Sequence, residues 1–201
     1  MKKVFVIGRG EEPLRKYEVG KGESLSLVFV VLPGVNCDVP LDIEICGEGA
    51  SVDVFGLYIC SSDEKVSLKL NLNHKVGGSV SNQLFKGIVG GTARTDFFGK
   101  IIVAQDAQKT EAYQTNHNLL LSDDAKVNTK PQLEIYADDV KCSHGAAVGS
   151  LNEEEQFYMC SRGITKKEAR ALQMQSFISP VTSQIDDETL IEEINNALRN
   201  L

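Results

Sequence analysis

The spacing of apolar residues changes late in the chain, and this change restricts the possible fold more than any other feature of the sequence. The segment 66–74, VSLKLNLNH, alternates apolar and polar side chains, and so does 41–45, LDIEI. Such alternation is typical of β-strands that place one face in a core. The runs 25–34 and 52–60 are more continuously apolar, as in strands that are buried on both faces. Residues up to about 149 are therefore predicted to form β-structure.

The predicted strands follow one another without helices between them. They recur about every 10–15 residues, a spacing expected of a sandwich, a barrel or a β-solenoid. The absence of a helical stripe argues against an alternating α/β fold. No internal repeat is evident by eye, and strand periodicity alone does not distinguish a sandwich from a solenoid. Turns or bulges are indicated by glycines, namely Gly47, Gly49, Gly77, Gly78, Gly90 and Gly91.

Helix signals begin after residue 150. Asn152 is typical of an N-cap, with Glu155 in the capping-box position three residues later. This helix is expected to end at Gly163. Thr165 and Glu168 form a second capping box, which opens a helix expected to stop before Pro180.

A third helix is predicted near the end of the chain, capped by Asp186 or Asp187. One amphipathic stripe along it contains Leu190, Ile191, Ile194 and Leu198. The predicted organisation is therefore a β-rich domain over 1–150 and a small helical domain over 151–201. No linker rich in Pro, Gly or Ser separates the two parts, so we expect the helices to dock on the β-rich body or on a partner.

The composition is ordinary for a globular protein, but the charge is acidic. The 201 residues have a net charge of −7, and the sequence pI is about 5.1. Lysine and arginine do not accumulate in any stripe along the chain. An acidic chain without a basic patch is a poor candidate for binding nucleic acid or anionic membranes.

The N-terminus, MKKVFVIGRGEE, contains only a short apolar run. A secretory signal needs an apolar region of roughly 7–15 residues, and a membrane span needs roughly 18. The cysteines are an odd number without paired spacing, which suits reduced thiols; they are Cys37, Cys46, Cys60, Cys142 and Cys160. We therefore expect a soluble cytoplasmic protein that neither enters nor binds a membrane.

Cys142 and His144 are the most chemically suggestive pair, because residues i and i+2 of a strand point to the same side. They are interpreted as half of a metal site completed by another subunit, as a nucleophile with its base, or as two packed core side chains. A closed zinc site needs four ligands, and no second CxxC or HxxxH motif is present. The nucleophile interpretation lacks an oxyanion-hole motif and an orienting third group.

The other candidate residues have simpler interpretations. His74 at the end of an alternating strand is expected to be solvated or to cap the core, and the same caution applies to His117. The acidic pairs 123–124 and 138–139 are expected to be solvated turn residues. Neither GxxxxGK[ST] nor GxGxxG between a strand and a helix is present, so nucleotide hydrolysis and dinucleotide chemistry are unsupported.

The segments 83–103 and 107–164, with the pair 169–170, resemble the SufB/SufD family of the SUF iron–sulfur cluster assembly system. The shared elements are QKT, NLLLS, CSHG and SRGI, in one order. The resemblance covers roughly residues 70–178. It is closer to the SufD branch, because SufB-type chains have a cysteine near Asn116 and a His-Glu-Ala element where this chain has His144-Gly145-Ala146.

The resemblance implies a right-handed parallel β-helix followed by a small helical domain. It further implies a non-enzymatic scaffold whose β-helix pairs with a SufB-type subunit or with a second copy of itself. The C-terminal helices would dock on SufC, the ABC-type ATPase. His144, with Cys142 beside it, would then help to ligate a transient iron–sulfur cluster at the subunit interface. The alternative is a structural dimerisation module that touches no metal.

Two departures from the family pattern also lead to expectations. Family members usually have a long N-terminal helical region, so this chain is expected to be a short version that lacks it. Cys160 stands where the family often has arginine, and it is expected to lie on a helix and to pack against neighbouring residues.

Overall fold

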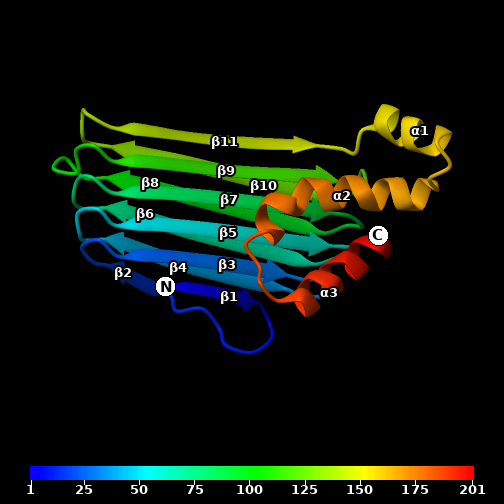
Figure 1. Ribbon diagram of the computed structural model, residues 1–201, viewed down its shortest axis with the longest axis horizontal. Coiled ribbons are helices and arrows are strands. Elements are labelled where there is room, and N and C mark those ends of the chain that lie inside the picture. The colour runs from blue at the N-terminus through cyan, green and yellow to red at the C-terminus, as the bar shows by residue number, and fades with distance from the viewer.

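The computed structural model describes residues 1–201 and contains eleven strands and three helices (Figure 1). The strands are β1 (Lys2–Val6), β2 (Lys16–Val19), β3 (Ser24–Val31), β4 (Cys37–Ile45), β5 (Ser51–Cys60), β6 (Lys65–His74), β7 (Val80–Val89), β8 (Arg94–Val103), β9 (Glu111–Leu120), β10 (Lys126–Ile135) and β11 (Lys141–Gly149). The helices are α1 (Glu153–Ser161), α2 (Lys166–Thr182) and α3 (Glu188–Arg199). The predicted change from strands to helices is therefore confirmed.

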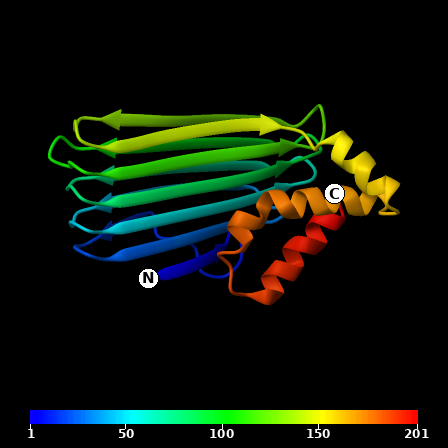
Figure 2. The same cartoon turned by 45° about the horizontal axis from the view of Figure 1, so that its top comes forward.

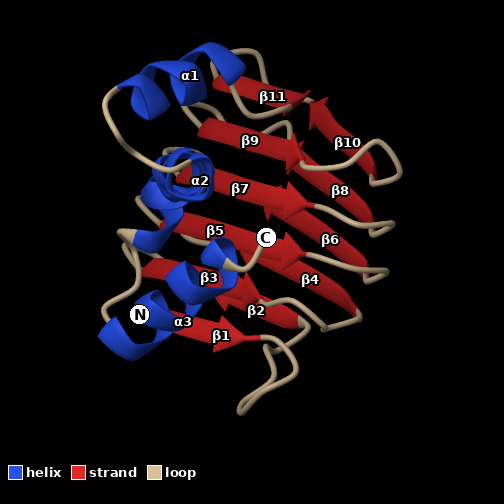
Figure 3. Cartoon of the chain, turned by 90° about the vertical axis from the view of Figure 1, so that its right-hand side faces the viewer, coloured by secondary structure: helices blue, strands red, loops and turns tan.

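Successive strands alternate between two parallel sheets. Sheet A has the order β1-β3-β5-β7-β9-β11, and sheet B has the order β10-β8-β6-β4-β2. Each pair of consecutive strands thus completes one coil of a β-solenoid, and Figure 3 shows the two sheets facing each other across a shared interior. The fold expected from the resemblance, a parallel β-helix followed by helices, is confirmed.

The coils stack in register. Ser24, Ser51, Val80, Glu111 and Lys141 are successive register partners in sheet A, so one coil takes about 30 residues. The coils differ in length by a few residues, and the side chains at equivalent positions differ from coil to coil. This variation explains why no repeat is evident in the sequence, although each coil is one structural unit that only its neighbours can cover.

The interior between the sheets is apolar at first and becomes polar in the later coils. Twenty-six buried residues from both sheets form the main core. The inner face of β9 instead presents Gln114, Asn116 and Asn118, all fully buried. Asn116 donates a hydrogen bond to the hydroxyl of Tyr58, which itself donates to Asn118. These bonds satisfy polar groups that would otherwise be costly to bury.

Helices α2 and α3 cover the part of the outer face of sheet A that lies toward the C-terminal ends of β3, β5 and β7 (Figures 1 and 2). Met174, Ile178 and Ile194 pack there against residues such as Leu57 and Ile88. This cover explains why the runs 25–34 and 52–60 are buried on both faces. It also confirms that the helices dock on the β-rich body. Helix α1 contacts α2 and stands clear of the sheets in Figure 2.

The helix boundaries agree with their predicted caps except at Pro180. Asn152 caps α1 as predicted, but the predicted capping box with Glu155 is not formed, because the carboxylate of Glu155 accepts a hydrogen bond from Gln173 instead. Thr165 and Glu168 form the expected capping box of α2, and Asp187 caps α3.

The prediction that α2 stops before Pro180 is wrong, because the helix continues to Thr182. Proline has no N–H to bond to the carbonyl of Ser176, and the hydroxyl of Ser179 donates to that carbonyl at 2.9 Å instead. The freed acceptor is therefore satisfied within the last turns of the helix.

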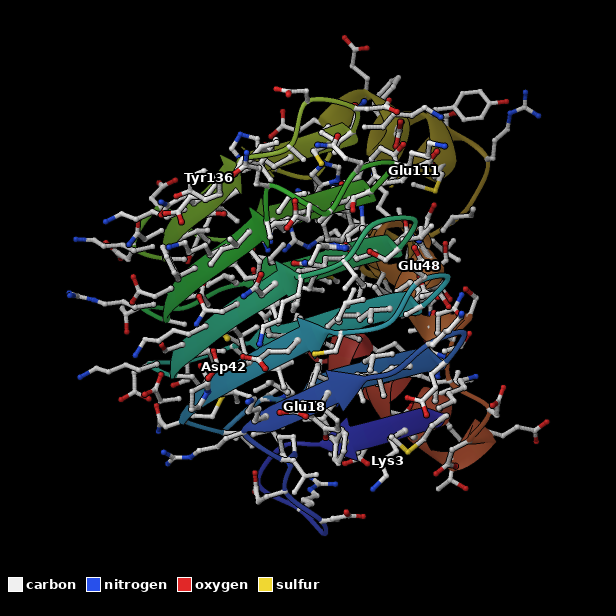
Figure 4. All side chains as sticks on the ribbon, turned by 90° about the vertical axis from the view of Figure 1, so that its left-hand side faces the viewer. Lys3, Glu18, Asp42, Glu48, Glu111 and Tyr136 are labelled. Carbon is white, nitrogen blue, oxygen red and sulfur yellow. The ribbon has the colours of Figure 1, made fainter.

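The outer face of sheet B is charged and solvated. Glu18 and Asp42 are labelled in Figure 4 among its side chains. Glu44 pairs with Lys16 at 3.1 Å and with Lys75 at 2.8 Å. Exposed pairs of this kind contribute little to stability. None of the three helices is long and apolar enough to cross a lipid bilayer.

His74 is fully buried inside the solenoid, so its expected solvated role is wrong and its core role is confirmed. Its Nδ1 lies 2.7 Å from the hydroxyl of Ser79, and its Nε2 lies 2.9 Å from that of Ser81. Burial lowers the pKa of His74 to about 4. The ring is therefore held neutral in the folded chain.

We predict that His74 makes the protein sensitive to mild acid. Between pH 6.5 and pH 4 the unfolded chain binds a proton at this ring and the folded chain does not. The free energy of unfolding should therefore fall by about 3 kcal/mol across this window. Urea melts at a series of pH values should show that His74→Gln loses this part of the drop, whereas the exposed His144→Gln retains it. A drop of the same size in His74→Gln would contradict the assignment.

Candidate functional site: the open end of the solenoid

The last coil of the solenoid has no further coil on top of it. β10 and β11 are the edge strands of their sheets, so their outer backbone edges pair with no strand. Their inner-face side chains, which would be core residues in any earlier coil, reach the surface here. Val148 is 46% exposed and Ile135 is 39% exposed. We call this surface the open end; its inner-face residues are Val127, Thr129, Pro131, Leu133, Ile135, Cys142, His144, Ala146 and Val148.

Cys142 and His144 both lie on the inner face of β11, as their spacing predicts. Their register partners on β9 are Ala112 and Gln114, both of which point into the interior. His144 is exposed at the open end, and Cys142 is half-buried and packs beside a small apolar cluster. The interpretation as two packed core side chains is therefore wrong for His144, and it describes Cys142 only in part.

The thiol of Cys142 is not activated. Burial raises its pKa, and a hydrogen bond with the backbone of Ala112 opposes this effect only in part. No hydrogen bond joins Cys142 to His144. A nucleophilic cysteine needs the opposite environment, one that stabilises the thiolate. The chain by itself therefore does not place Cys142 in an environment that activates a thiol.

The chain by itself does not assemble a metal site. No group of three or more His, Cys, Asp or Glu side chains is arranged to hold a metal ion. His144 and Cys142 supply at most two ligands, so any metal bound at the open end would need further ligands from another molecule.

The remaining histidine lies on the opposite side of sheet A. His117 is half-buried on the outer face of β9, where Lys86 donates a hydrogen bond to its Nδ1 at 3.2 Å. The ammonium group of Lys86 also lies 4.4 Å from the centre of the Phe177 ring. Burial, and then the charge of Lys86, lowers the pKa of His117. The structure therefore does not bring His117 together with His144.

Two other sequence features have structural roles. The acidic pairs at 123–124 and 138–139 are exposed in turns, as expected. The QKT element at 108–110 forms a corner between coils, where Lys109 has a φ of 60°. The carbonyl of Gln108 accepts a hydrogen bond from Gly78 N–H at 2.9 Å, and the hydroxyl of Thr110 donates to Ala107.

A cavity of about 920 Å³ lies where the ends of β9 and β11 meet α1 and α2. Cys160 is one of its lining residues and is exposed, so its expected helical position is confirmed and its expected packing is wrong. On the surface of α1, Phe157 is 77% exposed and Tyr158 is 59% exposed. We call these two aromatic residues the α1 patch.

Comparison with known proteins identifies the family of the chain. The family model described as "SUF system FeS cluster assembly, SufBD core domain" matches residues 14–177. The chain belongs to the SufBD family. The match begins well before residue 70, so the earlier coils also belong to the conserved core that the resemblance covered only in its later part.

Individual relatives agree with this assignment. The chain is 42% identical over 151 residues to the iron–sulfur cluster assembly protein SufD of Escherichia coli, which covers 75% of this chain and 36% of that protein. It is 48% identical over 114 residues to a SufBD family protein of Synechocystis, which covers 57% of this chain and 25% of that protein. A SufBD family protein of Pyrococcus horikoshii is 27% identical over 180 residues, which covers 90% of this chain and 40% of that protein. The SufBD chain described here thus spans less than half the length of each of these relatives.

Sequence reasoning missed the apolar part of the open end and the α1 patch. Alternate residues of 127–135 are apolar or small, but nothing in that pattern shows that no coil covers them. Phe157 and Tyr158 lie in a helix without a clear apolar stripe, so their exposure follows only from the position of α1.

We predict that Cys142 reacts slowly with alkylating reagents at neutral pH, because burial raises its pKa and shields the sulfur. The exposed Cys46 and Cys160 should be labelled first. Timed iodoacetamide labelling followed by peptide mass spectrometry measures each rate, and repetition at higher pH should accelerate Cys142. If Cys142 were the fastest thiol at pH 7, the cysteine-enzyme interpretation would have to be reopened.

Proposed function

We propose that this SufBD chain is a SufD-like scaffold subunit for iron–sulfur cluster assembly rather than an enzyme. A SufB-type chain, or a second copy of this one, docks on the open end, and a nascent cluster is held between the two as cargo. The observation that carries the proposal is the uncovered last coil, which presents His144 on a surface made of core-type residues. The family assignment is the reason for connecting this surface with iron–sulfur cluster assembly.

The open end has the two properties that a docking solenoid requires. The outer edges of β10 and β11 have backbone N–H and C=O groups without a strand partner, and such edges accept an added strand. The inner-face residues Val127, Leu133 and Val148 are apolar and only partly buried. A partner solenoid in register would bury these side chains and continue the interior, which makes the pairing favourable through the hydrophobic effect.

The ligand chemistry of the open end suits iron. Imidazole and thiolate both bind iron in cluster proteins. This chain contributes at most His144 and Cys142, so the partner would contribute the remaining ligands. A shared and incomplete ligand set favours release, which fits a site that assembles a cluster and passes it on.

Energy for assembly would come from a SufC-type ATPase docked on the C-terminal helices. Helices α2 and α3 share a buried core with sheet A, so a force applied to them reaches the coils directly. The α1 patch is the most exposed aromatic surface of the three C-terminal helices and is the proposed contact, and α1 is linked to the coils through its contact with α2. Nucleotide-driven closure of two ATPase subunits would then move the solenoids and open their interface.

The alternative is a structural dimerisation module that holds its partners together and touches no metal. It is favoured by the finding that this chain brings no three potential metal ligands together. The apolar open end would serve such a module equally well. The two proposed functions differ only in whether His144 coordinates iron. Either would operate in the cytoplasm, where the five free cysteines stay reduced.

We predict that His144→Ala lowers cluster formation about tenfold or more in a complex reconstituted with a SufB-type chain and the ATPase, because one iron ligand is lost. Iron and sulfide analysis and the absorption spectrum of the anaerobic complex measure this effect. His117→Ala, on the outer face of sheet A, is the matched control and should leave the yield unchanged. Equal yields in wild type and in the Cys142→Ser/His144→Ala double variant would favour the dimerisation module.

We predict that Phe157→Ser/Tyr158→Ser raises the Kd for the ATPase at least about 30-fold, since buried aromatic anchors typically supply 2 kcal/mol or more. Calorimetric titration measures the affinity. Leu14→Ser is the control, because Leu14 is 59% exposed but lies in the loop between β1 and β2. Removal of 151–201 is a weaker test, since it would also uncover Leu57 and Ile88 on sheet A. Unchanged affinity in the double variant would exclude the α1 patch as the contact.

A further inference from the structure

A column of polar side chains runs through the interior to His144. Gln83, Gln114 and His144 are register partners in three successive coils of sheet A, and all three lie on its inner face. The amide of Gln114 donates a hydrogen bond from Nε2 to Oε1 of Gln83 at 2.6 Å. Both glutamines are fully buried, with exposed fractions of 2% and 1%.

The column has an unsatisfied polar atom at each end. Nε2 of Gln83 and Oε1 of Gln114 are both buried and make no hydrogen bond in the structure. The register partner of Gln83 in the preceding coil is Val54, which has no polar side-chain atom, whereas the partner of Gln114 in the next coil is His144. A buried acceptor without a partner is unfavourable, so such a group usually marks a missing donor. The donor is expected on the side of Gln114 that faces away from Gln83, because the two polar atoms of an amide point in different directions.

The amide of Gln114 is held in place across the interior. Gly99, on β8 in the opposite sheet, lies against it, and a Cβ at this position would overlap the amide. Gly99 therefore leaves the space that the glutamine side chain fills. The hydrogen bond to Gln83 fixes one end of the amide, and the contact with Gly99 limits its rotation.

His144 occupies the next position of the same column. Amide side chains stacked in register on parallel strands form ladders in which each carbonyl accepts from the following residue. In this ladder the residue that follows Gln114 is an imidazole, which can donate through one ring nitrogen and offer the other as a ligand.

The exposed side chain of His144 makes no hydrogen bond to Oε1 of Gln114 in the structure. We propose that Gln114 is a positioning residue for His144: when the ring turns toward the interior, Oε1 of Gln114 accepts a hydrogen bond from one ring N–H, and the unprotonated nitrogen faces out of the open end. The hydrogen bond selects one tautomer and one ring orientation, as groups behind metal-binding histidines commonly do. The functional half of this inference rests on the proposed role of His144 as an iron ligand. The hydrogen bond itself can be tested without any metal.

The hydrogen bond is tested by ¹⁵N NMR of the histidine side chains in the full chain. The chain has three histidines, so His74→Gln and His117→Gln assign the spectrum. At pH 8.5, where imidazoles are ordinarily neutral, wild-type His144 should show a single tautomer. Gln114→Met, which keeps the length but removes the acceptor, should give a mixture of both tautomers. Gln114→Glu, which keeps an acceptor oxygen, should restore the single form.

Asn116→Leu is the matched control. Asn116 is buried on the same strand and face, but its register partner is Ala146 rather than His144. It should leave the His144 tautomer unchanged, with thermal melts establishing that each variant is folded. If Gln114→Met does not fold, Gly99→Ala displaces the same amide and should release the tautomer. A tautomer mixture in the wild type, an unchanged tautomer in a folded variant, or the same change in Asn116→Leu would overturn the hydrogen bond.

Cluster formation in the reconstituted complex tests the functional half. Gln114→Met should lower the yield by about tenfold, the lower end of the effect of removing a group behind a metal ligand. A freed tautomer with full cluster yield would overturn the positioning role. If His144→Ala itself leaves the yield unchanged, the proposed function fails, and the NMR result still decides whether Gln114 holds the ring.

Discussion

The in-register stacking of parallel strands is the constraint on which the rest of this structure depends. Each inner-face side chain lies directly above its register partner one coil earlier. The register therefore decides which side chains contact each other in the interior. A slip of one residue would turn every side chain of a strand to the other face. The same register places His144 above Gln114 and Cys142 above Ala112. The candidate site is therefore a product of backbone pairing over the whole solenoid.

The chain covers one apolar surface and leaves another exposed. The apolar part of the outer face of sheet A is covered by the chain's own helices, and Met174, Ile178 and Ile194 are buried there. The interior at the last coil is left uncovered, with His144 and Val148 exposed. A chain that covers one surface and leaves the other available is suited to pairing at that second surface. This asymmetry supports the proposal that a partner solenoid docks at the open end.

One chain supplies only part of a metal ligand set at the open end. Cys142 is shielded and its pKa is raised, and His144 belongs to no group of three or more potential metal ligands. The buried amides behind His144 orient the ring without competing for a metal. Under the proposed function, cluster binding at this site therefore depends on ligands from a second subunit.

The sequence by itself determined the strand-to-helix change near residue 150, the caps of the three helices and the shared side of Cys142 and His144, because these follow from local periodicity and capping chemistry. Resemblance, rather than periodicity, supplied the choice of a β-helix. Tertiary structure alone decided that α2 runs through Pro180, that His74 is sealed inside and that Gln114 stands behind His144. The helix passes Pro180 because Ser179 satisfies the freed carbonyl and Val181 is buried against the core beneath the helices. The positions of His74 and Gln114 depend on contacts between opposite sheets or successive coils, and because the coils differ in length, the sequence does not show which residues meet.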